Sequence, residues 1–128
     1  MQRVTGIGGV FFKAKDVKAM AAWYEKHLGI PFGDQSYYGF QWVNENNQAV
    51  PGQTAFSFFK NDTTYFSPSE KPFMINFRVK DLAALLAALK EEGVEIVGEM
   101  QDYPGMGKFG WCVDPEGNKV ELWEPVDD

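Results

Sequence analysis

Cysteine and histidine are nearly missing from this sequence, which contains one of each, Cys112 and His27. A single cysteine excludes an intrachain disulfide and a cysteine-rich zinc site. Cys112 falls within a strand-like run with no histidine or lysine run beside it, so we expect a buried, unreactive thiol. His27 lies near the end of the first predicted helix, where a solvated imidazole is the commoner role.

Long apolar runs are missing too. No stretch reaches the roughly 20 apolar residues that a membrane span requires, and the N-terminal residues lack the apolar segment of a signal peptide. We therefore expect a cytoplasmic protein. Basic residues number 12 against 18 acidic ones, and the formal net charge is −6. This balance disfavours nucleic acid, whose phosphates are bound by clustered lysine and arginine, and it would suit a cationic ligand.

Aromatic residues are plentiful, at 16% of the 128 residues. A chain of this length forms one domain with a substantial core, and most of the aromatic side chains are expected there or at a subunit contact. Aromatic rings also line pockets for flat or cationic ligands.

The stretch 109–125 has the pattern of a β-hairpin. Two apolar-rich runs, Phe109–Val113 and Lys119–Trp123, flank the turn-forming sequence Asp-Pro-Glu-Gly-Asn at 114–118. Neighbouring side chains of a strand point to opposite faces, so Val120 and Leu122 share one face and Glu121 lies on the other.

A strand followed by a helix occurs twice. Val-Phe-Phe-Lys-Ala-Lys-Asp at 10–16 recurs as Ile-Asn-Phe-Arg-Val-Lys-Asp at 75–81. The two aspartates are good N-caps, for helices predicted over 17–28 and 82–92, and a glycine follows each helix. The remaining predicted strands are 9–15, 38–43, 54–60, 72–80 and 94–97, with 30–32 as a further candidate interrupted by a proline. We expect loops at 44–53 and 101–107.

This repeat predicts one α+β domain over 1–128. Module one covers about 5–60, a turn-rich linker about 61–71, and module two about 72–125. Two β-α-β-β-β modules would form a curved, U-shaped mixed sheet with helices on the convex face and a cleft on the concave face. Alternation assigns the helix side to Val10, Phe12, Ile75, Phe77, Val79, Val120 and Leu122. It assigns the cleft to Gly9, Phe11, Lys13, Met74, Asn76, Arg78, Glu121 and Trp123.

With these motifs the chain resembles the vicinal oxygen chelate superfamily, which includes glyoxalase I, extradiol dioxygenases, and fosfomycin and bleomycin resistance proteins. The most specific piece is Asp-Pro-Glu-Gly-Asn at 114–118 followed by Val-Glu-Leu at 120–122. The resemblance implies a U-shaped sheet around a site, usually with a divalent metal, and a homodimer.

The ligand positions that the resemblance implies are Gly9, Met74 and Glu121. Gly9 offers no side chain, and a thioether is a poor ligand for the usual hard divalent ions. Only Glu121 keeps a suitable donor, so we expect no metal and no other cofactor. A divalent metal held by a non-standard set of ligands is the alternative.

Three roles remain open for Glu121. A buried carboxylate is costly unless a cation or hydrogen-bond donors neutralise it. An ion pair with Arg78, or with Lys13 or Lys119 on the same face, would need no function. Alternatively, Glu121 receives a cationic or donor group of a ligand, or acts as a general base, which makes it the one candidate catalytic residue.

The leading functional hypothesis is a metal-independent small-molecule-binding protein with an unknown, cationic or aromatic, ligand. The alternatives are a metal-dependent lyase, isomerase or dioxygenase, and a non-catalytic interaction module whose cleft is filled by its own side chains. The candidate ligand-binding residues are Glu121, Trp123, Asn76, Arg78, Trp42, Phe56 and Trp111.

Overall fold

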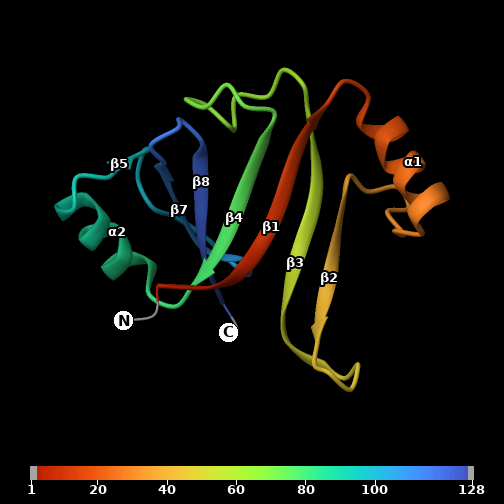
Figure 1. Cartoon of the computed structure of the whole chain (residues 1–128), viewed down its shortest axis with the longest axis horizontal. Helices are drawn as coiled ribbons and strands as arrows, with labels where there is room; N and C mark the ends of the chain where they lie inside the picture. Colours follow the sequence, from red (N-terminus) through yellow and green to blue (C-terminus); the bar gives the residue numbers. More distant parts are fainter. Residues whose placement is uncertain (1–2, 127–128) are drawn as a thin grey trace.

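The computed structural model describes residues 3–126, which form two helices and one eight-stranded mixed sheet. The helices lie at opposite ends of this sheet (Figure 1). The elements are β1 (Val4–Ala14), α1 (Val17–Leu28), β2 (Tyr37–Val43), β3 (Ala49–Lys60), β4 (Phe73–Val79), α2 (Leu82–Glu91), β5 (Glu95–Ile96), β6 (Gln101–Tyr103), β7 (Gly107–Val113) and β8 (Lys119–Pro125). The predicted α+β class with two related modules is confirmed. Neither helix in the described range is long and apolar enough to cross a membrane.

The helix boundaries follow the predicted caps. The side chain of Asp16 accepts a hydrogen bond from the backbone N–H of Ala19, and Asp81 accepts one from Ala84. Each aspartate thereby satisfies one of the N–H groups that the first turn of a helix leaves without a partner. Gly29 ends α1 in the left-handed conformation, at φ 71°.

The two modules meet where β1 and β4 pair in antiparallel fashion, and the strand order is β2-β3-β1-β4-β8-β7-β5, with β6 beside β7. β1 also pairs in parallel with β3, and β4 pairs in parallel with β8. The register between β1 and β4 shifts between Ile7 and Gly9, which marks a bulge. This bulge lies in the middle of the sheet, close to the residues of the candidate site.

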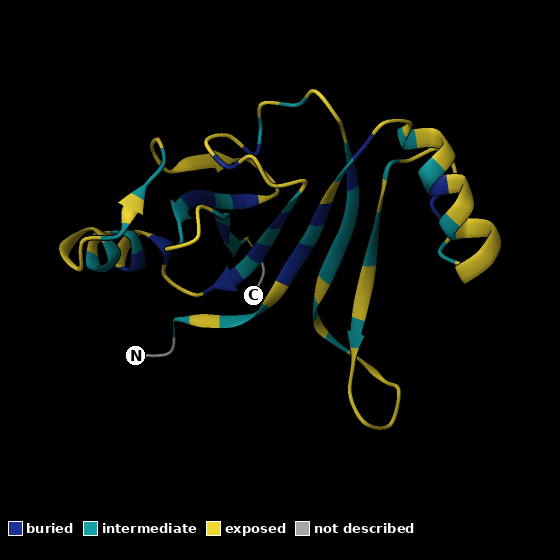
Figure 2. Cartoon of the chain, turned by 45° about the horizontal axis from the view of Figure 1, so that its top comes forward, coloured by how far each residue is buried: buried dark blue, intermediate teal, exposed yellow. Residues whose placement is uncertain are grey.

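Apolar side chains form separate clusters on the two faces of the sheet. On the helix side, Phe58 packs with α1, and Leu122 packs with α2. On the concave side, Met74, Trp111 and Phe66 form a third cluster. Buried, half-buried and exposed positions all occur along β1, as Figure 2 shows. The side-chain alternation predicted for β4 and β8 agrees with these clusters.

The hairpin between β7 and β8 has the predicted turn. Asp114 Oδ1 accepts from the backbone N–H groups of Glu116 and Asn118, at 2.9 Å each. These bonds hold the pKa of Asp114 below its usual value, with the side-chain bond from Asn118 as the largest cause. Gly117 adopts φ 84°, a conformation that glycine reaches without strain. The turn therefore fixes the register in which β8 carries Glu121.

The first strand, β1, begins at Val4 and not at residue 9 as predicted, and three other segments were also predicted wrongly. Residues 49–53, predicted as a loop, belong to β3 and pair with β2; Pro51 is tolerated because β1 joins β3 only from Ala55 onward. Residues 30–32 form no strand, because Phe32 is buried in the α1 cluster instead. Residues 101–103, predicted as a loop, form β6 against β7.

Candidate functional site

The candidate site lies on the concave face, where four strands place their polar and aromatic residues side by side. In the parallel pair of β4 and β8, Asn76 is the register partner of Glu121, and Arg78 is the partner of Trp123. On the other side of β8, Trp111 of β7 is opposite Glu121. The two registers thus bring Glu121 beside Asn76, which is 45 positions earlier in the chain, and beside Trp111, which is 10 positions earlier.

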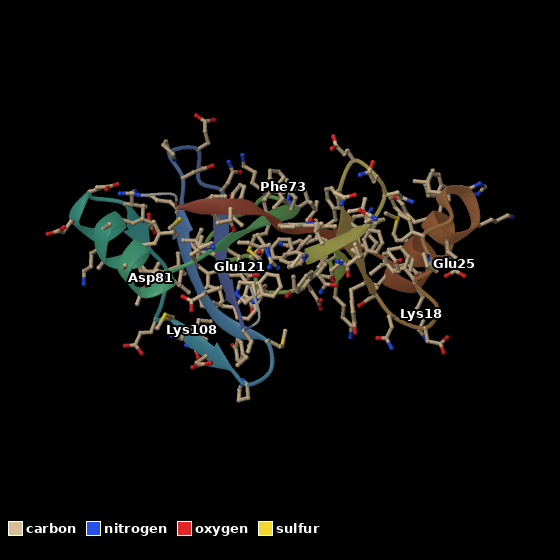
Figure 3. All side chains as sticks on the ribbon, turned by 90° about the horizontal axis from the view of Figure 1, so that it is seen from below. Lys18, Glu25, Phe73, Asp81, Lys108 and Glu121 are labelled. Carbon is tan, nitrogen blue, oxygen red and sulfur yellow. The ribbon has the colours of Figure 1, made fainter. Side chains whose placement is uncertain are left out.

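Glu121 is buried, with 2% of its surface exposed, and lies near the middle of the molecule between the two helices (Figure 3). Its Oε1 accepts a hydrogen bond from Asn76 Nδ2 at 2.7 Å. Its Oε2 accepts one from Trp111 Nε1 at 2.8 Å and another from the Tyr65 hydroxyl. Three neutral donors from three parts of the chain therefore stabilise the carboxylate in the interior. We call Glu121, Tyr65, Asn76 and Trp111 the carboxylate cluster.

Tyr65 reaches this cluster from the connection between β3 and β4. Burial and the neighbouring Glu121 carboxylate both raise the pKa of its hydroxyl well above the usual value, so it stays a donor. Lys119 holds the same segment: its Nζ donates to the backbone oxygen of Tyr65 at 2.6 Å and lies over the rings of Tyr65 and Trp111. Burial lowers the pKa of Lys119, and the charge of Glu121 opposes that shift. Phe66 is fully buried and belongs to the apolar cluster against which Tyr65 packs.

The connection at 61–71 is therefore part of the site, although its turn-rich sequence predicted a linker. It covers the part of the concave face where Glu121 lies. The signal that we missed is the aromatic pair Tyr65-Phe66 inside an otherwise polar segment. A pair of large rings in such a segment indicates a loop that folds back onto the core.

The residues around Glu121 do not fit the metal that the resemblance implies. The groups that bind its carboxylate oxygens are N–H and O–H donors, which take the positions where an ion would bind. Gly9 has no side chain, and Met74 is packed in the concave apolar cluster. Residues 3–126 contain no group of three or more His, Cys, Asp and Glu side chains that could hold an ion. A catalytic divalent ion usually needs about three such ligands.

Arg78 lies one register step further along the strands than Asn76. Its guanidinium carbon is 4.9 Å from the centroid of one Trp42 ring and 5.0 Å from that of Trp123. Among residues 3–126, Arg3 and Glu92 form an ion pair on the surface, whereas Arg78 and Glu121 do not pair, so the structure does not support this alternative for Glu121. Two indoles next to the cation attract it electrostatically. We call Arg78, Trp42 and Trp123 the aromatic bracket.

Hydrogen bonds hold both indoles of the bracket in place. Trp42 Nε1 donates to Thr54 Oγ1 at 2.8 Å, and this hydroxyl donates to the backbone oxygen of Ile7. Trp123 Nε1 donates to the backbone oxygen of Met106 at 2.8 Å, and its ring stacks on Phe109. Because each ring is fixed by a hydrogen bond, the bracket is preorganised around Arg78.

Glycines on β1 make room for these side chains. A Cβ atom on Gly6 would lie 2.7 Å from Trp42 Cη2, and one on Gly8 would overlap Asn76 Oδ1 and lie 3.0 Å from Trp123 Cε3. Cβ atoms do not approach other atoms this closely, so these two positions require glycine or a shift of the site residues. The sequence around the bulge in β1 thus permits both the carboxylate cluster and the bracket.

A pocket of about 250 Å³ opens beside the aromatic bracket. Its lining includes Arg78 and Trp123, the amide side chains of Gln41 and Gln53, and the exposed side chain of Met106; Glu121 is not part of it. A larger hollow of about 540 Å³ lies against α1 instead, where Lys18 and Glu25 are found. Figure 3 shows Lys18 and Glu25 at one end of the molecule, away from Glu121. We take the smaller pocket as the candidate site because its lining contains the buried Arg78 and the half-buried Trp123.

The remaining predicted site residue lies elsewhere. Phe56 packs with Tyr24, Phe32 and Phe58 in the α1 cluster, on the opposite side of the sheet from Glu121. Trp42, Arg78 and Trp123 come together in the aromatic bracket, and of these Arg78 and Trp123 line the pocket. Asn76 and Trp111 come together at the buried carboxylate.

The comparison with protein families decides the relationship. The family described as the Glyoxalase/Bleomycin resistance protein/Dioxygenase superfamily matches residues 6–122. The chain belongs to this superfamily. Its resemblance to the vicinal oxygen chelate proteins is thereby confirmed. Among curated proteins, none matches the chain.

Solved structures agree on the fold of this superfamily member. Methylmalonyl-CoA epimerase from Mycobacterium tuberculosis is 23% identical, with a TM-score of 0.63, over 98% of this chain and 91% of that one. A variant of Streptomyces coelicolor methylmalonyl-CoA epimerase in complex with 2-nitronate-propionyl-CoA is 15% identical, with a TM-score of 0.67, over 96% of each chain. NAD-dependent benzaldehyde dehydrogenase from Legionella pneumophila is 11% identical, with a TM-score of 0.59, over 91% of this chain and 97% of that one. At these identities the similarity extends to the arrangement of strands.

Proposed function

We propose that this superfamily member is a metal-independent protein that binds a small molecule in the pocket beside Arg78. One observation carries the proposal: Glu121 receives its hydrogen bonds from protein donors, while a separate pocket opens on the same face, lined by Arg78 and by Trp123, whose indole is held by a hydrogen bond. Ligand sites typically combine apolar walls with a few placed polar groups. Trp123 and Met106 supply the apolar walls, and Arg78 with two glutamine amides supplies the polar groups.

The enzymatic alternative depends on Glu121. To act as a general base, this carboxylate must reach a substrate proton within hydrogen-bond distance. Its two oxygens already accept from Asn76, Trp111 and Tyr65, and a metal-dependent lyase, isomerase or dioxygenase would also need a ligand set that Gly9 and Met74 do not provide. These contacts favour binding over catalysis. The filled region around Tyr65 agrees in part with the third alternative, an interaction module, but the pocket at Arg78 favours a small ligand.

A homodimer and a cytoplasmic location belong to the same proposal. Phe12 of β1 and Phe40 of β2 are about 40% exposed, at 38% and 42%. A second copy of this chain covering these residues would remove their apolar surface from water. Light scattering is expected to give a dimer for the native protein and a monomer for Phe40→Glu; a monomeric native protein would contradict the expectation.

The binding proposal is tested by a thermal-shift screen against small acids, bases and neutral aromatic compounds. A compound that binds the folded state raises the unfolding midpoint. Each hit is measured again with Gln53→Trp, which puts a large ring at the pocket lining, and with Gln101→Trp, which adds the same ring on exposed β6. Loss of the shift in the first variant alone is the expected result. A screen without hits, or hits that both variants keep, would refute binding at this pocket.

A further inference from the structure

We infer that a second copy of this chain pairs with the outer edge of β2, so that the two β2 strands run antiparallel with Gly39 on the two-fold axis. The inference rests on the homodimer proposed above and narrows its contact to one strand edge, which includes Phe40 and leaves Phe12 outside. It also places a side chain of the second copy at the rim of the pocket.

The outer edge of β2 is open. β2 is the last strand of the sheet, and among residues 3–126 it pairs with β3 alone (Figure 1). Directly before β2, the backbone oxygen of Ser36 accepts from the N–H of Phe58 at 2.9 Å, in the register of the β2–β3 pair. Residues bonded to the neighbouring strand alternate with residues that are not. The backbone groups that point to the open edge are therefore those of Tyr37, Gly39 and Gln41.

The second module shows what this edge of the fold accepts. β7 has the place in module two that β2 has in module one, since each lies two strands out from the central β1–β4 pair. The outer edge of β7 is covered by antiparallel pairing with β5 and with β6. In module one, the segment after the helix contains Pro31 and forms no strand, because Phe32 is buried in the α1 cluster. The same edge is thus paired in one module and open in the other.

The sequence of β2 lacks the usual protection of an exposed edge. Native proteins commonly protect edge strands with charged residues or proline, and Tyr37–Val43 contains neither. Tyr37 is 56% exposed and Phe40 is 42% exposed. An open edge with exposed aromatic rings and no charge favours pairing with another strand.

A second copy fits this edge because a two-fold axis at Gly39 pairs the backbone and the side chains together. Tyr37 is then bonded to the partner subunit's Gln41, so the outward N–H and C=O groups find partners. Tyr38 lies opposite the partner subunit's Phe40, at a position without hydrogen bonds where side chains approach most closely. Within one chain the rings of Tyr38 and Phe40 already contact edge to face, with centroids 5.0 Å apart. The axis joins the two ring pairs into one aromatic cluster.

The same register connects the dimer to the pocket. Gln41 is one of the residues that line the pocket. Tyr37 and Gln41 lie on the same face of β2, because side chains of a strand alternate. The partner subunit's Tyr37 therefore lies beside Gln41, with Cα atoms about 5.5 Å apart, as in other hydrogen-bonded antiparallel pairs. Each pocket would thus have a tyrosine of the other subunit at its rim.

A charge swap at Gly39 tests the axis. Gly39→Glu and Gly39→Lys each bring two like charges together across the axis, whereas a mixture of the two variants brings opposite charges together. A Cβ at Gly39 meets the end of the Gln53 side chain in both variants, so the two differ in charge alone. Sedimentation equilibrium is expected to show each variant associating about tenfold more weakly than the equimolar mixture.

Hydrogen exchange followed by NMR tests the edge without a change at Gly39. The backbone amides of Tyr37, Gly39 and Gln41 are expected to exchange at least about tenfold more slowly in the native dimer than in Phe40→Glu. The amides of Tyr38 and Phe40 bond to β3 and should be protected in both proteins. Phe12→Glu is the matched control, because Phe12 is similarly exposed but lies on β1, and this variant is expected to remain a dimer.

A native dimer in which the three outward amides exchange as fast as in Phe40→Glu would overturn the inference and leave the homodimer standing. So would a mixture of the Gly39 variants that associates no better than either variant alone, or species larger than a dimer, which would mean that the edge accepts a different strand. A monomeric native protein would refute the proposed homodimer itself. Binding of a small molecule is tested separately by the thermal-shift screen.

Discussion

The amide of Asn76 on β4 donates to the carboxylate of Glu121 on β8 over 2.7 Å, and the two residues are register partners in a parallel pair of strands. The hydrogen bond from Asn76 stabilises the buried charge of Glu121, and the strand register brings the two side chains together. Turning the amide toward Glu121 directs Asn76 Oδ1 to Gly8 on β1, where the absence of a side chain leaves room for it. Three strands thus determine how one carboxylate is bound.

Trp111→Phe tests how much the carboxylate cluster stabilises the fold. The change keeps most of the ring and removes the N–H that donates to Glu121. A hydrogen bond to a charged group contributes about 1.5–3 kcal/mol, so the free energy of unfolding in urea is expected to fall by that amount. Trp23→Phe on exposed α1 is the control and is expected to cost less than about 0.5 kcal/mol. Equal losses in the two variants would mean that the indole donor contributes nothing.

Gly8→Ala tests the close packing at the bulge of β1. The added Cβ would overlap Asn76 Oδ1 and press on Arg78 and Trp123, so we expect a loss of about 1–3 kcal/mol in urea unfolding. Gly39→Ala is a matched control, because the new Cβ there meets only the side chain of exposed Gln53, which can move. If both variants unfold at the same urea concentration as the native protein, the site tolerates a side chain at Gly8.

Tyr65→Phe should change how stability depends on pH. The pKa of Tyr65 is raised in the folded state above its usual value of 10, first by burial and then by Glu121. Its contribution is therefore complete below about pH 10 and is lost as the unfolded chain ionises above that pH. The native protein should lose up to about 1.4 kcal/mol per pH unit there from this group, and Tyr65→Phe should not.

The lowered pKa of Lys119 acts in the opposite direction, since its charged form is disfavoured in the folded state. The penalty is removed as pH rises from the folded pKa toward the usual value of 10.5, so this residue adds stability with rising pH. Both proteins in the comparison contain Lys119, so the difference between their urea-unfolding curves at pH 9 to 11 isolates Tyr65. If the free energies of unfolding of the two proteins change equally with pH over that range, Tyr65 does not keep its proton in the folded state.

Chelation tests the proposed independence from metal. Because the oxygens of Glu121 accept from Tyr65, Asn76 and Trp111, dialysis against EDTA should leave the thermal midpoint within about 1 °C of its original value. Elemental analysis of the purified protein is expected to give less than one ion per ten chains. Stoichiometric zinc, iron, manganese or nickel that disappears in Glu121→Ala would refute the proposal and favour the enzymatic alternative.

The sequence predicted the fold well because its strongest signals are local. Asp16 and Asp81 as caps, the turn at Asp114 and the alternation along β8 each depend on a few adjacent residues. The same alternation correctly put Asn76, Arg78, Glu121 and Trp123 on one face. Local patterns could not show which cation neighbours which anion, because register between β4 and β8 decides that; Arg78 lies one step too far along the strand to pair with Glu121.

The position of Tyr65 at the candidate site was not predicted, for a different reason. The segment around it contains turn residues and has no periodicity, so it reads as a connection between modules. Its position over Glu121 results from the burial of Phe66 and the bond from Lys119 to the Tyr65 backbone, both contacts between residues distant in sequence. Phe56 was misplaced because β3 carries apolar side chains on both faces, which leaves no alternation to read.

The crowding at Gly9 limits which side chains this position can accept. A Cβ on Gly9 would lie 2.7 Å from the ring of Phe11 and 3.3 Å from the backbone oxygen of Ala55. A histidine introduced at Gly9, the position of a metal ligand elsewhere in the superfamily, would therefore collide with the apolar core before it reached Glu121. Introducing such a ligand requires that Phe11 first become smaller, a change that loses core packing and by itself adds no metal. The concave core thus makes a metal ligand at Gly9 hard to introduce by a single substitution.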